Sequence, residues 1–94
     1  MITALVRFTV EDIEKWKPVF VEAAALRKGY GSMSAQAFHQ ADNKNEIYVL
    51  LSFESVEKAK QMFQSEEFRE VTKRGGMTAP PVVTFLDEVA SLPS

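Results

Sequence analysis

Hydrophobic and polar positions along the chain follow two periods, one typical of strands and one typical of helices. Alternation at every second residue predicts a strand over residues 2–10 and, most clearly, over 46–54. A weaker strand, rich in alanine and serine, is expected over 32–41, and a last one over 82–89. The polar residues 42–45 should form the loop that joins the two middle strands into a hairpin.

Apolar residues at helical spacing predict two helical regions between the strands. The first begins near Asp12, and Pro18 is expected to divide it into a short turn over 12–16 and a main helix with the proline in its first turn. The second should contain two helices, capped by Ser55 and Ser65. The apolar stripe of the first region consists of Ile13, Trp16, Phe20, Ala23 or Ala24, and Leu26 or Arg27.

This order of elements, β-α-β-β-α-β, is that of the ferredoxin-like α+β fold. Right-handed crossovers place the first strand between the third and the last, which gives a four-stranded antiparallel sheet with helices on one face. The other face has no helix, yet Leu5, Leu50 and either Val82 or Leu86 are expected to point there. Because a half-apolar, uncovered sheet face is typical of an interface, we expect a homodimer formed through this face.

Composition narrows the class of protein. The chain of 94 residues is expected to form a single domain over 1–94. Its 11 basic and 13 acidic residues give a net charge of −2, which argues against nucleic acid as a partner. The absence of cysteine and the single histidine exclude thiolate chemistry and a multi-histidine metal site within one chain, and no cofactor or metal is expected. With no signal-peptide pattern and no membrane-spanning stretch, we expect a cytoplasmic protein with no membrane partner.

Several segments resemble those of the small dimeric α/β-barrel proteins. Residues 10–20, read as V-E-D-I-E-K-W-K-P-V-F, are similar to the V-x-D-x-x-x-W-K-x-x-F pattern that opens these proteins. Segments 41–46, 57–59 and 81–86 are similar to their hairpin turn and later landmarks, with Lys44 where many members have proline. That superfamily includes cofactor-independent antibiotic-biosynthesis monooxygenases, muconolactone-isomerase-like enzymes, polyketide cyclases and stress-responsive barrels. The resemblance implies a dimeric α/β barrel and leaves the reaction open, because function depends on the site more than on the fold.

Three polar residues are the candidates for chemistry. If the hairpin loop is 42–45, His39 lies opposite Tyr48, and Arg7 is expected on the same face, between the sheet and the partner's sheet. His39 would act as general base, Arg7 would stabilise an anion, and Tyr48 would hydrogen-bond a substrate oxygen. The alternatives are a hydrogen-bonded strand histidine, an arginine in a salt bridge with Glu54, Asp87 or Glu88, and an interface tyrosine.

Three functions stay open at this point. The first is a cofactor-independent monooxygenase-like or cyclase-like enzyme acting on a small aromatic or polyketide-like substrate, which the resemblance favours. The second is a non-catalytic module that binds a small apolar ligand. The third is a structural dimer without a pocket, its interface filled by Leu5, Leu50 and Tyr48. A cavity of roughly 300 Å³ or more would argue against the third.

Overall fold

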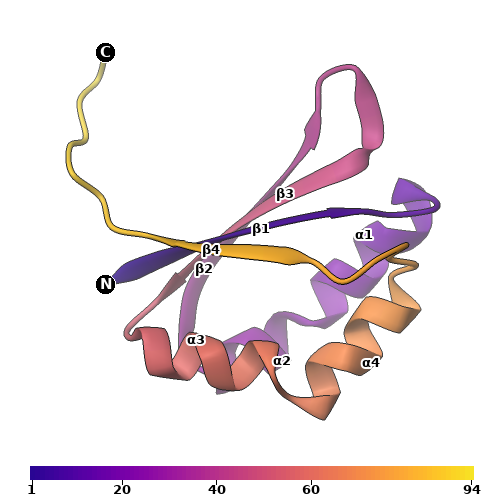
Figure 1. The fold of residues 1–94 in the computed structure, drawn as a ribbon, viewed down its shortest axis with the longest axis horizontal. Helices are drawn as coiled ribbons and strands as arrows, with labels where there is room; N and C mark the ends of the chain where they lie inside the picture. Colours follow the sequence, from indigo (N-terminus) through magenta and orange to yellow (C-terminus); the bar gives the residue numbers. More distant parts are fainter.

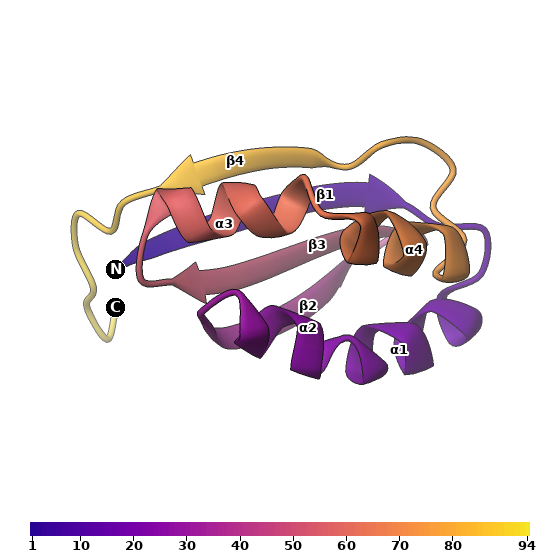
Figure 2. The ribbon, with the colours of Figure 1, turned by 90° about the horizontal axis from the view of Figure 1, so that it is seen from below.

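A four-stranded antiparallel sheet and a layer of four short helices make up the fold in the computed structural model, which describes residues 1–94 (Figure 1). Figure 2 shows that the helices all lie on one side of the sheet. The elements along the chain are β1 (Ile2–Thr9), α1 (Ile13–Glu22), α2 (Ala24–Gly29), β2 (Ser32–Gln40), β3 (Asn43–Phe53), α3 (Val56–Phe63), α4 (Glu66–Arg74) and β4 (Val82–Leu86).

The strand order across the sheet is β2-β3-β1-β4, and each neighbouring pair is antiparallel. This confirms the predicted ferredoxin-like α+β architecture, in which the first strand lies between the third and the last. Strand ends differ slightly from the prediction: β4 ends at Leu86 and not at Val89, and β1 ends at Thr9. None of the helices is long and apolar enough to cross a membrane.

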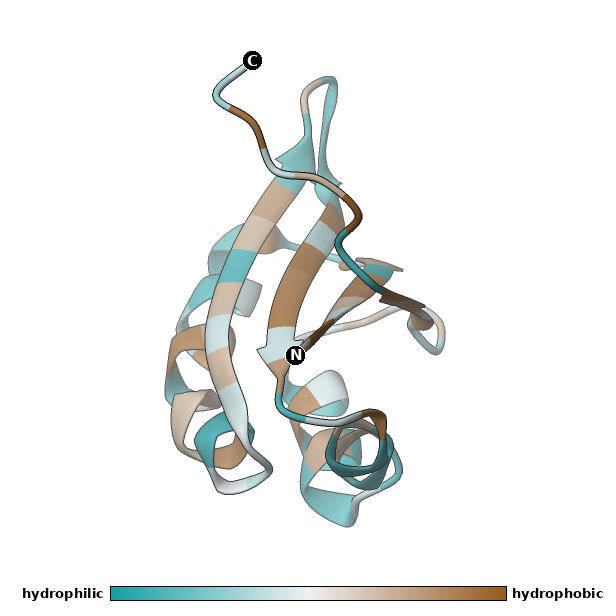
Figure 3. Cartoon of the chain, turned by 90° about the vertical axis from the view of Figure 1, so that its left-hand side faces the viewer, coloured by the Kyte–Doolittle hydropathy of each residue, from teal (hydrophilic) through white to brown (hydrophobic).

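The core lies between the sheet and the helices. Alternate residues of β1 and β3 point into it, and Trp16 of α1 covers them, with its ring centroid 5.6 Å from Phe8 and 4.9 Å from Phe20. Figure 3 shows hydrophobic residues along the strands and a largely hydrophilic hairpin tip. The core cluster comprises Ala4, Val6, Phe8, Val10, Trp16, Ile47, Val49, Leu51, Phe53, Ala59 and Met62.

The helix starts are where the sequence predicts them. Asp12 accepts a hydrogen bond of 2.9 Å from the backbone N–H of Glu14, and Ser65 accepts one of 3.1 Å from that of Phe68. Ser55 caps α3 in the same way, at 3.3 Å from the backbone nitrogen of Lys58. Each cap satisfies one of the amide donors that a helix start leaves unpaired.

Pro18 does not divide the first helix, so that prediction is wrong. Helix α1 runs without a break from Ile13 to Glu22, and the chain interrupts it only at Ala23, before α2. Pro18 is exposed on the outer side, where water can reach the backbone it leaves unpaired. Trp16 and Phe20 on the inner side hold both halves of α1 against the core.

The hairpin is tighter than predicted. Strand β2 ends at Gln40 and β3 begins at Asn43, so the turn is only residues 41–42, and the expected loop over 42–45 is wrong. The Gln40 side chain donates a hydrogen bond of 2.7 Å to Asp42, and the Asn43 side chain accepts one of 3.1 Å from the backbone N–H of Asn45. Residues 43–45 of the expected loop therefore belong to β3, whose pairing with β2 is irregular between His39 and Gln40.

Candidate functional site

The tight turn and the irregularity between the His39 and Gln40 pairings together shift the register of β2 by one residue. Phe38, and not His39, lies opposite Tyr48, while His39 lies opposite Ile47. Since Ile47 is buried beneath the helices, His39 belongs to the helix side of the sheet. The structure therefore does not bring His39 together with Arg7 and Tyr48, and the expectation of one shared face is wrong for His39.

His39 lies at the exposed edge of the sheet beside α1. Its Nδ1 is 2.8 Å from the carbonyl oxygen of Gln40. Because a carbonyl can only accept, Nδ1 is the donor in this contact. The ring borders a shallow depression of about 280 Å³ together with Lys17 and Val21. This is the hydrogen-bonded strand histidine of the alternative interpretation.

Arg7 and Tyr48 do lie opposite each other, on the face of the sheet that carries no helix. Arg7 is exposed and forms no salt bridge, so the expected partners Glu54, Asp87 and Glu88 do not hold it. The predicted apolar residues of this face are there, and both alternatives for β4 are correct. These residues are Leu5, Leu50, Val82 and Leu86, and Phe38 lies on the same face.

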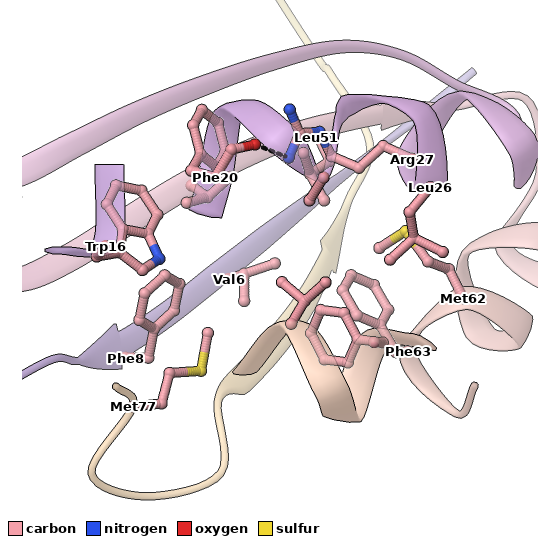
Figure 4. Close-up of a pocket in the computed structure, with 14 residues that line it drawn as sticks. Val6, Phe8, Trp16, Phe20, Leu26, Arg27, Leu51, Met62, Phe63 and Met77 are labelled. Atoms are coloured by element: carbon pink, nitrogen blue, oxygen red, sulfur yellow. Dashed lines mark hydrogen bonds between the residues drawn. The ribbon is translucent and has the colours of Figure 1, made fainter. Parts of the chain in front are cut away.

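A different site lies under the helices. A cavity of about 50 Å³ lies between the helices and strands β1 and β3 (Figure 4). Thirteen of its fourteen lining residues are hydrophobic, and the exception is Arg27. The lining consists of Val6, Phe8, Trp16, Phe20, Ala23, Leu26, Arg27, Val49, Leu51, Met62, Phe63, Phe68, Val71 and Met77.

Arg27 is held in place by Phe20, one helix back. Its Nη1 donates a hydrogen bond of 2.8 Å to the Phe20 carbonyl oxygen, drawn in Figure 4, and its guanidinium lies 4.3 Å from the centre of the Phe20 ring. Burial removes water from the guanidinium and lowers the pKa of Arg27. The group still carries its charge near neutral pH, because an arginine starts from so high a pKa.

An apolar cavity with one cation at its wall suits an aromatic molecule that carries or develops negative charge. The cation would stabilise that charge, because burial has removed part of the water around it. The sequence did not predict this role, and it placed Arg27 only as one alternative on the apolar stripe. The available signal was that a charged residue shares a stripe with Trp16 and Phe20, where a leucine would be ordinary.

No protein-family model and no curated protein matches the sequence. Solved structures do. A candidate antibiotic biosynthesis monooxygenase of Bordetella bronchiseptica superposes with a TM-score of 0.84 at 17% identity, over 95% of this chain and 97% of that one. SnoaB, a cofactor-independent oxygenase from Streptomyces nogalater, gives 0.80 at 16% identity, over 99% and 97%. A candidate antibiotic biosynthesis monooxygenase of Caulobacter crescentus gives 0.74 at 21% identity, over 95% and 90%.

The chain has the fold of the antibiotic biosynthesis monooxygenases. The match runs nearly end to end, as the resemblance in the sequence implied. At these identities the likeness concerns the fold, and the chemistry of this chain has to be argued from its own residues.

Proposed function

We propose that the chain is a cofactor-independent, monooxygenase-like enzyme that binds a small aromatic or polyketide-like substrate in the cavity beneath the helices. The observation that carries the proposal is the placement of Arg27, the single charged side chain on an otherwise hydrophobic cavity wall. The likeness to SnoaB, described as a cofactor-independent oxygenase, supports the reaction type.

The chemistry that fits this wall is the oxidation of a carbon acid by oxygen. A substrate with a CH₂ group next to a carbonyl or aryl group loses a proton to water and becomes an enolate, whose negative charge Arg27 stabilises. The enolate gives two electrons to O₂ and, with one proton returned from water, becomes a hydroperoxide on that carbon. Loss of water from the hydroperoxide breaks the O–O bond and takes two further electrons from the carbon. One oxygen atom becomes the new carbonyl of the product, and the other leaves as water with the two hydrogens of the oxidised carbon. A cyclisation would use the same enolate as the carbon nucleophile, which is why a cyclase-like reaction suits the same site.

The cavity has to widen to admit such a substrate. Its volume of about 50 Å³ is well below the ~300 Å³ at the lower end of ligand sites. Helix α4, like α2, has no fully buried residue, so it is held less firmly than α1 and α3, which have buried residues. An exposed ion pair of 3.3 Å between Arg74 and Glu22 links α4 to α1, and an exposed pair of this kind contributes little to stability. We therefore regard the structure as the closed state of the site.

Oxygen uptake with anthrone, an aromatic ketone with one acidic CH₂ group, tests the proposal. The wild-type protein should consume one O₂ per anthrone converted to quinone, after treatment with a chelator. Arg27→Gln, which keeps the first three carbons and the polarity of the side chain but removes its charge, should lower kcat/KM about tenfold to a hundredfold. Lys28→Gln is the matched control, because Lys28 is the neighbouring cation and does not line the cavity.

Other outcomes decide between the remaining functions. Saturable binding of anthrone, recovered unchanged, would favour a non-catalytic binding module. A rate that is the same in Arg27→Gln and in wild type would refute the role of Arg27.

We also propose that the chain forms a homodimer through the helix-free face of the sheet. Phe38, Val82 and Leu86 on that face are 52%, 53% and 41% exposed, and an apolar face of this kind is stabilised when a second copy covers it. A second copy is the simplest occupant, because a two-fold axis through the face would place Leu5 and Leu50 of both copies against each other. Arg7 and Tyr48 would lie in this interface, and they stay a candidate pair for a site between the two sheets.

A further inference from the structure

A second concave site lies on the other side of α4 from the cavity. It is a groove of about 560 Å³ between α4, the connector to β4, and β4 itself. This volume falls within the range of small-molecule sites, roughly 300–1,000 Å³. The residues that line it are Phe63, Phe68, Arg69, Thr72, Lys73, Met77, Thr78, Ala79, Pro80, Pro81 and Val83.

The groove and the cavity share a wall. Phe63, Phe68 and Met77 line both of them. The rings of Phe63 and Phe68 meet edge to face, with 5.2 Å between their centroids. Both side chains are only partly buried, as is Met77. Because aromatic and thioether side chains can change rotamer without breaking hydrogen bonds, this partition is one that a ligand can displace.

The rim of the groove carries positive charge. Arg69 and Lys73 both line it, and no acidic residue does. Lys73 takes part in no salt bridge, whereas Arg69 is 3.2 Å from Glu66 in an exposed pair on the same helix. On a chain with a net charge of −2, two cations beside an aromatic floor form a local patch for an anionic group.

We propose that this groove binds an aromatic carboxylate and is the entrance to the cavity. The aromatic part of the ligand lies on Phe63, Phe68 and Met77, and its carboxylate lies between Lys73 and Arg69. The binding part of the proposal stands alone, while the role as entrance rests on the proposed function. The connector that closes the groove is tied to β1, because the backbone N–H of Thr78 donates a hydrogen bond of 3.0 Å to the carbonyl oxygen of Thr9.

The test uses two probes of the same shape, 2-naphthoate and its neutral counterpart 2-naphthamide, with calorimetry at low ionic strength. Naphthoate should bind more tightly than naphthamide, and the difference should shrink in high salt. Lys73→Gln should weaken naphthoate binding about threefold to fivefold and leave naphthamide within about twofold. Lys60→Gln is the matched control, because Lys60 is exposed on α3 and does not line the groove.

Two results would overturn the binding proposal. One is a lack of saturable naphthoate binding, and the other is an equal loss in Lys73→Gln and Lys60→Gln, which would mean that only the overall charge matters. If naphthoate binds, it should also inhibit anthrone oxidation by raising KM, and Lys73→Gln should relieve the inhibition. Inhibition that is independent of Lys73 would refute the entrance. If the protein oxidises anthrone but does not bind naphthoate, the groove proposal is wrong and the proposed function still stands.

Discussion

Arg27 and Phe20 form a double contact at the wall of the cavity. The guanidinium donates to the Phe20 carbonyl at 2.8 Å, and it also stacks against the Phe20 ring at 4.3 Å. The carbonyl and the ring fix the guanidinium from two directions, and the contact bridges the junction between α1 and α2. An arginine so fixed is pre-organised, and it loses little further freedom when it meets an anion.

The same contact should stabilise the fold. Replacing Arg27 by Gln removes a charged hydrogen bond and a cation–π contact, and we expect the free energy of unfolding to fall by about 1–2 kcal/mol. Urea denaturation followed by circular dichroism measures this. Lys28→Gln should change stability by less than about 0.5 kcal/mol, because Lys28 is an exposed side chain without such partners. Equal stability of the two variants would show that the double contact contributes nothing.

His39 should be dispensable for activity. It lies on the helix side of β2, is exposed, and does not line the apolar cavity. We expect His39→Ala to oxidise anthrone at a rate within about twofold of wild type, whereas Arg27→Gln is strongly impaired. Steady-state oxygen uptake is measured for both variants and for Arg7→Ala. The comparison shows which of the three side chains the reaction needs. If His39→Ala lost as much activity as Arg27→Gln, the histidine would be needed for the reaction and this prediction would be wrong.

The fold could be predicted from the sequence because it depends on patterns that extend over many residues. Alternation fixes which side of β1 and β3 is buried, and the order of elements leaves one plausible topology. The face of His39 depends instead on a single local event, the irregularity between His39 and Gln40. A shift of one residue in a turn reverses every side chain of the strand, and no long pattern in the weakly hydrophobic β2 opposes it.

The cavity was harder to predict for a different reason. Its lining comes from β1, β3 and all four helices, so it depends on tertiary packing that no local spacing encodes. Trp16, Phe20 and Met62 have the spacing of core residues. They do pack in the core or against it, and they also line the cavity. Only Arg27 carried a local signal, as a charge in an apolar stripe.

The glycines at the end of α4 should differ from Gly29 in their tolerance of a side chain. A methyl group at Gly75 would come within 3.0 Å of Trp16 and 3.2 Å of the Val71 carbonyl oxygen, whereas at Gly29 it would meet nothing within 4 Å. We expect Gly75→Ala to lower the stability by about 1–3 kcal/mol, and Gly29→Ala to leave it unchanged or raise it by up to about 1 kcal/mol. Thermal unfolding of both variants measures the difference. A Gly75→Ala protein as stable as wild type would mean that the Trp16 ring moves freely.

The homodimer should depend on the centre of the helix-free sheet face. Leu50 pairs with Leu5 in the sheet, and a charge there would have to be buried without a partner in the assembled dimer. We expect the wild-type chain to sediment as a dimer at micromolar concentration and Leu50→Asp as a folded monomer. Val21→Asp is the matched control, because Val21 is 69% exposed on α1, on the opposite side of the sheet, and it should stay dimeric. A wild-type protein that sediments as a monomer would refute the dimer. Dissociation by Val21→Asp would place the interface on the helices.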